Sequence, residues 1–224
     1  PANAVGDDIQ LYTDDTRSQV AMTWYGMRQQ TEKQAVDGIM RPSRCLADFT
    51  APRADAKDAI NSGAVYASNI RATGQNGTQK PDYIGLFAVT TGIGSEKKEK
   101  YFTDDNDDYS AIMLKALADR LAEAFAEALH HRVRTDLWGY AADEALSQDD
   151  MVAEKYQGIR PAPGYPACPD HSVKAAMFEL LQCQDIGMGL TESLAMTPAA
   201  SVSGFYLSHP DATYFNVGKI TEDQ

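Results

Sequence analysis

The sequence predicts an α+β fold, in which a twisted antiparallel sheet packs with one long helix and several shorter helices. Three observations lead to this prediction. Residues 107–138 repeat apolar side chains every four positions, as a long helix does. Short stretches near both ends of the chain carry strand-forming residues between turn residues. The chain has no internal repeat and no evident linker, so we expect one domain over residues 1–224.

The composition limits the classes of partner. The 224 residues are 43% hydrophobic, which is enough for a core, and the formal net charge is -12. This charge argues against nucleic acid or an anionic membrane surface as the main partner. No apolar run approaches the ~20 residues of a membrane span. The three cysteines, Cys45, Cys168 and Cys183, have no disulfide-framework spacing, so a reducing compartment and a cytoplasmic location are expected.

The first half of the chain predicts strands and one insertion. Residues 7–12 and 19–25 read as a hairpin around a turn at 13–15, and residues 82–91 form the clearest buried strand. Residues 51–80 are rich in Gly, Ser, Asn, Ala and charge and predict a surface insertion. Residues 93–106 are charged and predict a loop, with room for one helical turn.

The long helix has two notable sides. An apolar stripe at four-residue steps predicts the side that faces the core: Met113, Leu117, Leu121, Phe125, Leu129, Val133 and Leu137. A second sector brings together Ile112, Ala116, Asp119, Glu123, Ala126 and His130. Two interpretations of its carboxylates stay open. They form a solvated face in which Lys115 pairs with Asp119, or Glu123 or Asp119 meets a cationic group among small side chains.

The second half predicts two shorter helices and three strands. Residues 147–156 begin with a capping box of Ser147 and Asp150, and residues 172–184 are amphipathic. The strands are expected at residues 190–196, 200–208 and 213–220, as an antiparallel meander.

Residues 158–169 contain four prolines within nine positions, which excludes a helix interior or a central strand. The segment is therefore expected to be a stiff, extended ribbon with carbonyls open to a ligand's amino groups. Arg160 can present a bidentate fork to a carboxylate, and Tyr165 offers a flat face with a polar tip. The alternative is a surface connector in which Arg160 is solvated.

Motifs of a self-contained enzyme are absent from the sequence. It has no glycine-rich nucleotide loop, no nucleophile elbow and no zinc-protease motif. Cys168 and His171 are two possible metal ligands, which are too few for a zinc site. A binding domain without catalytic residues of its own is therefore expected.

Several long stretches resemble one family, the activation domain of cobalamin-dependent methionine synthase. They are DDYSAIMLKALADRLAEAFAEALHHRVR, WGYA, YQGIRPAPGYPACPDH, LTESLAMTPAASVSG and YLSHPDATYF, with PANAVGDDI, RQQ, CLADF and DYIGLFAVT nearer the start. The resemblance covers about residues 1–50 and 81–220, and it does not place residues 51–80.

The resemblance implies a C-shaped α+β body that binds S-adenosylmethionine in a shallow groove. Such a domain supports reductive reactivation: flavodoxin or a reductase supplies an electron, and S-adenosylmethionine remethylates cobalamin held by a neighbouring domain. The parent enzyme transfers a methyl group from methyltetrahydrofolate to homocysteine, with cobalamin and zinc in its other domains. This chain alone is not expected to turn over.

The resemblance also assigns roles to residues of the ribbon. Arg160 matches the arginine that holds the ligand's carboxylate, Ala162 matches the position whose backbone meets the adenine, and Tyr165 matches a tyrosine that lines the ligand. Before the ribbon in sequence, Glu123 matches a glutamate that relatives carry on a helix near the ligand's amino end. Tyr214 matches a late tyrosine, with Phe215 beside it where some relatives carry a second tyrosine.

Two features of the family are missing from these residues: an aspartate in an upstream Asp-Trp segment and a C-terminal helical tail. We therefore expect a fragment truncated at the N-terminus and at the C-terminus, with weakened ligand binding. The alternative function is a protein-docking module, in which the groove clasps the cobalamin domain and the electron donor without binding the ligand.

Overall fold

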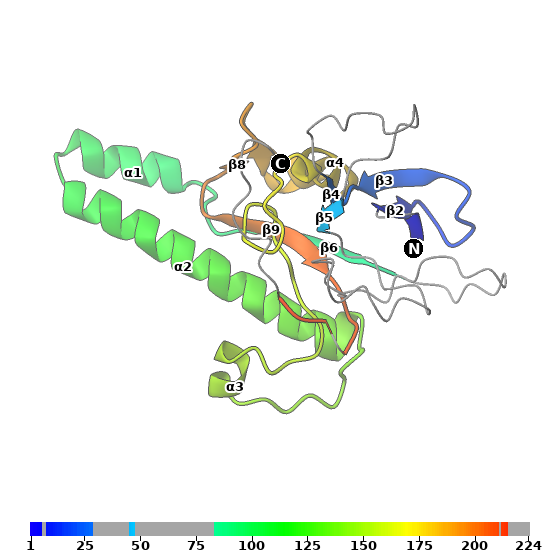
Figure 1. Ribbon diagram of the computed structural model, residues 1–224. Helices are drawn as coiled ribbons and strands as arrows, with labels where there is room; N and C mark the ends of the chain where they lie inside the picture. The colour runs from blue at the N-terminus through cyan, green and yellow to red at the C-terminus, as the bar shows by residue number, and fades with distance from the viewer. Residues whose placement is uncertain (6–7, 29–44, 48–82, 211, 215–224) are drawn as a thin grey trace, which may run out of the picture. The chain divides into compact units, whose positions relative to one another are not determined.

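The computed structural model describes residues 1–5, 8–28, 45–47, 83–210 and 212–214 (Figure 1). They fall into two compact units. The first unit comprises Pro1–Gly85, Gln157–Asp170 and Leu207–Gln224, and the second comprises Leu86–Tyr156 and His171–Tyr206. Phe215 and the predicted insertion at 51–80 lie outside the described residues. No helix of the described part is both long and apolar enough to cross a membrane.

The first unit contains a three-stranded antiparallel sheet of β1 (Ala2–Val5), β2 (Asp8–Tyr12) and β3 (Val20–Trp24). Side chains alternate across a strand, and one face is buried through Ile9, Leu11, Met22 and Trp24. The predicted hairpin of β2 and β3 is confirmed. β1 was not predicted, because Ala-Asn-Ala-Val is a weak strand former that pairing with β2 stabilises. A second small sheet pairs β4 (Met27–Arg28) with β5 (Cys45–Ala47).

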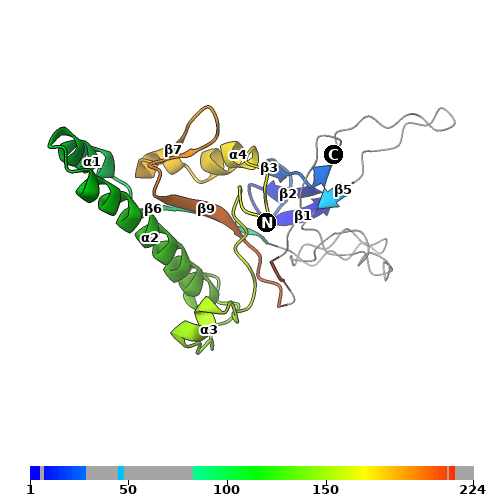
Figure 2. The same ribbon diagram turned by 60° about the vertical axis from the view of Figure 1, so that its left-hand side comes forward.

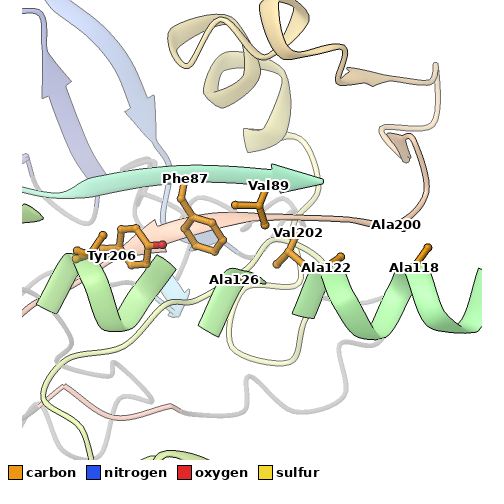
Figure 3. Packing of buried hydrophobic residues seen from close by; sticks show 9 residues of the cluster. Phe87, Val89, Ala118, Ala122, Ala126, Ala200, Val202 and Tyr206 are labelled. Atoms are coloured by element: carbon orange, nitrogen blue, oxygen red, sulfur yellow. The ribbon is translucent and has the colours of Figure 1, made fainter. Parts of the chain in front are cut away.

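The second unit is built on α2 (Asp108–Arg132), which lies along the paired strands β6 (Gly85–Thr90) and β9 (Ser201–Tyr206). Figure 3 shows their shared core, in which side chains of both strands point toward the helix. Its members are Phe87, Val89, Ala118, Ala122, Ala126, Val133, Ala200, Val202 and Tyr206. The helix contributes mainly alanines, whose small side chains allow its backbone to approach the sheet.

The predicted long helix is confirmed, but the prediction of its buried side was wrong. The buried positions of α2 are Ala111, Ala118, Ala122, Ala126 and His130. Most of the expected core stripe is exposed instead, with Leu117 at 55%, Leu121 at 59% and Phe125 at 47%. The large side chains of the sheet, Phe87 and Tyr206, fill the interface, so the helix packs its small residues there.

The ends of α2 follow local rules. The Asp107 side chain accepts a hydrogen bond from the Ser110 backbone N–H at 3.0 Å and caps the helix. At the other end the helix continues as the π-helix Val133–Leu137, and Gly139 follows with a positive φ of 73°.

Residues 93–106 contain a helix rather than the predicted loop. α1 (Ser95–Asp104) packs against α2, as Figures 1 and 2 show from two sides. Its charged residues are good helix formers, and Glu99 of α1 forms an ion pair with Lys115 of α2. Lys115 therefore pairs with α1 and not, as one interpretation of the sequence had it, with Asp119.

The later elements are shorter than predicted. α3 (Gln148–Val152) begins with the predicted capping box of Ser147 and Asp150, and α4 (Val173–Leu180) is followed by the 3-10 helix Cys183–Ile186. The three-stranded meander was wrong. Its first strand is instead a small hairpin of β7 (Gly189–Leu190) and β8 (Met196–Thr197), and β9 pairs with β6. Of the third predicted strand, residues 213 and 214 are not in a strand, and residues 215–220 lie outside the described residues.

Candidate ligand-binding site

The proline ribbon lies in the first unit, beside the chain that leaves β9. Ile159 and Leu207 exchange two backbone hydrogen bonds, from Ile159 N–H to Leu207 O at 2.8 Å and from Leu207 N–H to Ile159 O at 3.0 Å. The Gln157 side-chain amide also donates to the carbonyl of Ser208 at 2.9 Å. The start of the ribbon is therefore fixed to the chain that follows β9 and does not behave as a loose connector.

Arg160 is held at its backbone by another predicted site residue. Its N–H donates to the hydroxyl oxygen of Tyr214 at 3.0 Å. Its neighbours Ile159 and Pro161 are both buried, while Arg160 itself is half-buried. The structure thus brings together Arg160 and Tyr214, which are 54 positions apart in the sequence. A guanidinium based on such a fixed backbone is suited to bidentate recognition of a carboxylate.

The prediction that the whole ribbon is extended was wrong, because residues 162–168 form a tight turn that presents Tyr165. The Ala162 carbonyl accepts from Tyr165 N–H at 3.2 Å, and the Tyr165 carbonyl accepts from Cys168 N–H at 2.9 Å. Gly164 donates its N–H to the carbonyl of Cys168 at 2.7 Å and has a φ of 101°, which requires glycine. This turn leaves the Tyr165 side chain 53% exposed. An aromatic face is therefore available a few residues from Arg160 on the same fixed stretch of backbone.

Cys168 closes the turn as a buried thiol. It is 4% exposed, and burial together with the charge of Asp170 raises its pKa from 9.0 to about 12. Since the thiolate is the nucleophile and the metal ligand, this cysteine stays neutral and unreactive near neutral pH. In the part of the chain that the structure describes, no three His, Cys, Asp or Glu side chains gather as a metal-binding group.

The other predicted site residues are placed differently. Glu123 lies on α2, in the second unit, and is exposed, as is Asp119. Ala126 and His130 of the same predicted sector are buried. The contact of Glu123 with a ligand stays a prediction. The same holds for Phe215, which lies outside the described residues.

An aromatic and charged cluster in the second unit was not predicted. His130 is fully buried and stacks on the ring of Tyr206, with centroids 5.2 Å apart, while Tyr156 meets it edge-on at 4.9 Å. Arg134 is also fully buried. Its guanidinium binds both carboxylate oxygens of Glu144, at 2.7 and 2.8 Å, and lies 4.2 Å from the centre of the Tyr156 ring.

Two members of this cluster are the last residues of their segments in the second unit. Tyr156 directly precedes Gln157, where the chain enters the first unit before the ribbon, and Tyr206 directly precedes Leu207. The available sequence signal was the spacing of His130 and Arg134, one turn apart on the predicted helix. It was missed because a histidine on a helix is more often a surface residue.

Two comparisons with known proteins find the same family. A family model described as "Vitamin B12 dependent methionine synthase, activation domain" matches residues 1–224. A solved structure described as "Crystal Structure of the MetH Reactivation Domain bound to AdoHcy" is 51% identical in sequence, with a TM-score of 0.75. The match covers 100% of this chain, and this chain spans 61% of the length of the matched one.

Proposed function

This chain belongs to the family of activation domains of vitamin B12 dependent methionine synthase, and from that premise we propose that it binds S-adenosylmethionine on the ribbon and Tyr214. The observation that carries the proposal is the hydrogen bond from Arg160 N–H to the Tyr214 hydroxyl at 3.0 Å. A relative at 51% identity was crystallised with AdoHcy, which is what remains when S-adenosylmethionine has given up its methyl group.

The chemistry of the ribbon fits the parts of this ligand. The guanidinium of Arg160 matches the carboxylate of the methionine moiety, because both are planar and present two hydrogen-bonding atoms in parallel. We assign the adenine to the backbone at Ala162. The exposed ring of Tyr165 provides an aromatic face for the ligand, and such faces attract cations, including a sulfonium. Tyr214 orients the ribbon through its hydroxyl and lies beside the same site.

Glu123 and Phe215 complete the proposed ligand set. A carboxylate such as Glu123 suits the ligand's ammonium group, directly or through water. Phe215, which follows Tyr214 in the sequence, is the second residue that we assign to the ligand. Both assignments rest on the family resemblance.

The proposed role of binding is reductive remethylation. S-adenosylmethionine supplies an electrophilic methyl group on its sulfonium, and the acceptor is reduced cobalamin held by a neighbouring domain, after flavodoxin or a reductase has supplied one electron. The residues of this chain bind and orient the methyl donor. The parent enzyme, acting in the cytoplasm, transfers a methyl group from methyltetrahydrofolate to homocysteine, with cobalamin and zinc bound by its other domains.

Isothermal titration with S-adenosylmethionine tests the proposal. We expect saturable binding by the activation domain and a loss of about 2 to 4 kcal/mol for Arg160→Ala, or ~30- to 1000-fold in Kd, because a bound carboxylate loses its charged partner. Arg132→Ala is the matched control, since Arg132 lies exposed on α2 and pairs with Asp136. Equal affinities for Arg160→Ala and the control would remove Arg160 from the site.

A further inference from the structure

A row of buried side chains in the second unit runs from the sheet to a charged pair. We call it the buried stack, and in order of contact its members are Phe87, Tyr206, His130, Tyr156, Arg134 and Glu144. The rings of Phe87 and Tyr206, both labelled in Figure 3, are stacked with centroids 4.6 Å apart. No ring of the stack is more than 8% exposed, Arg134 is fully buried and the Glu144 side chain is 5% exposed. The whole row therefore belongs to the interior of the second unit.

Stability alone does not account for the charged end of the buried stack. Taking Arg134 and Glu144 out of water has a desolvation cost that their bidentate pair must offset, and apolar side chains of similar volume often stabilise a core as well. A bidentate pair and a cation over a ring have one property that apolar packing lacks, since each requires a defined geometry. Because the guanidinium lies 4.2 Å from the centre of the Tyr156 ring, the charged pair fixes where that ring lies.

The buried stack also holds the two residues from which the chain enters the ligand site. Tyr156 and Tyr206 both contact the ring of His130. Two residues separate Tyr156 from Ile159, while Leu207 follows Tyr206 directly. Ile159 and Leu207 exchange the two backbone hydrogen bonds that fix the start of the ribbon. Contact of both tyrosines with one histidine therefore restricts the register in which this backbone pair forms.

The two residues between Tyr156 and Ile159 leave the chain little slack. Gln157 donates its side-chain amide to the Ser208 carbonyl at 2.9 Å, and Gly158 has a φ of 81°, in the region that favours glycine. Since successive Cα atoms are about 3.8 Å apart, the chain from Tyr156 to Ile159 reaches at most ~11 Å. A displacement of Tyr156 is therefore passed on to the ribbon.

We propose that His130 and Tyr156 are positioning residues of the ligand site. They act through the backbone, by holding Ile159 and Leu207 in register, and Arg160 is the next residue after Ile159. The effect on S-adenosylmethionine rests on the proposed function, whereas the effect on the backbone pair does not. If the buried stack were only a part of the core, any equal loss of stability in the second unit would act on the backbone pair in the same way.

Hydrogen exchange in the intact methionine synthase polypeptide tests the backbone effect without a ligand. Mass spectrometry of peptides that contain Ile159 and Leu207 reports the opening of their two hydrogen bonds. Tyr156→Leu removes the ring and should speed exchange of both amides by about tenfold or more, while Tyr156→Phe keeps the ring and should stay within about twofold of the parent. Exchange that is unchanged in Tyr156→Leu, or equally fast in both variants, would overturn the proposal.

A second variant tests the effect from a residue far from the ribbon in sequence. His130→Leu keeps an apolar side chain at a buried position but removes the ring that contacts Tyr156 and Tyr206. Met188→Ala is the matched control, because Met188 is 2% exposed and belongs to a different core cluster of the same unit. His130→Leu should speed exchange of the two amides about fivefold more than the control does. Equal acceleration would show that the buried stack contributes stability alone and would overturn the proposal.

Titration of S-adenosylmethionine into the same proteins measures the effect on the ligand site. His130→Leu should raise the Kd by roughly threefold or more, and Met188→Ala by less than about twofold. Faster exchange with an unchanged Kd would overturn the positioning role. Absence of binding by the parent would instead overturn the proposed function, and the exchange rates would still decide whether the buried stack holds the backbone pair. If His130→Leu does not fold, the comparison of the two Tyr156 variants decides.

Discussion

At the scale of single residues, the site depends on how Arg160 is fixed. The hydroxyl of Tyr214 accepts a hydrogen bond from the backbone N–H of Arg160, and the two neighbours of Arg160 in the sequence are buried. Pro161 also restricts the backbone before it. Binding to an arginine whose backbone is already fixed costs less conformational entropy than binding that must first order a loop. More of the ion-pair energy therefore remains for affinity.

Cys168 provides a residue-scale prediction about pH. Because burial and Asp170 raise the pKa of its thiol from 9.0 to about 12, the folded chain keeps this proton where the unfolded chain loses it. The contribution of Cys168 to stability is therefore complete below pH 9 and is lost between about pH 9 and 12. At pH 8 we expect iodoacetamide to label Cys168 only at the rate at which the structure opens.

Peptide mass spectrometry measures this labelling residue by residue. In guanidinium chloride, Cys168 should react as fast as a free thiol, which controls for the reagent. Rapid labelling of Cys168 at pH 8 in the folded protein would show that its thiol is accessible and its turn is open.

At the scale of elements, α2 shows that a sequence pattern can predict a helix without predicting which side of the helix is buried. Periodicity predicted the helix, because spacing at four residues depends only on helical geometry. It could not predict the buried side, since the buried alanines of α2 and the exposed row of Leu117, Leu121 and Phe125 are both apolar. Which side packs on the sheet is decided by the space left beside Phe87 and Tyr206, and that space depends on tertiary structure.

The element-scale prediction compares one substitution at two positions of α2. Ala122 is 2% exposed against the sheet, so Ala122→Leu should lower the free energy of unfolding by about 1 to 3 kcal/mol through overpacking. Ala116 is exposed, and Ala116→Leu should change it by less than about 0.5 kcal/mol. Urea denaturation measures both. A larger loss for Ala116→Leu than for Ala122→Leu would mean that the helix packs on its other side.

Other elements show where local sequence patterns fail to predict the secondary structure. α1 was read as a loop because it lacks apolar periodicity, yet its charged residues favour a helix once α2 is beside it. The strand predicted at residues 190–196 became a hairpin, since residues 191–195 contain polar turn formers such as Thr191 and Ser193, which hydrogen-bond to each other. The capping box of Ser147 and Asp150 was predicted correctly because it involves neighbours only.

At the scale of the whole molecule, the decisive contacts join distant parts of the sequence. Ile159 pairs with Leu207, Arg160 with Tyr214, and β6 with β9. Composition and periodicity do not encode such pairings, so reasoning from residues alone predicted the stiff ribbon and the role of Arg160 but left Tyr214 unnoticed. The family resemblance supplied Tyr214, and the structure then placed its hydroxyl on the Arg160 backbone.

The most direct test of the account is a crystal structure of the activation domain grown with AdoHcy. The account predicts that the ligand's carboxylate binds the guanidinium of Arg160 in a bidentate pair, with N to O distances of about 2.7 to 2.9 Å. Its adenine should meet the backbone at Ala162, while Tyr214 still accepts the Arg160 N–H. A ligand bound elsewhere, with its carboxylate away from Arg160, would contradict the account.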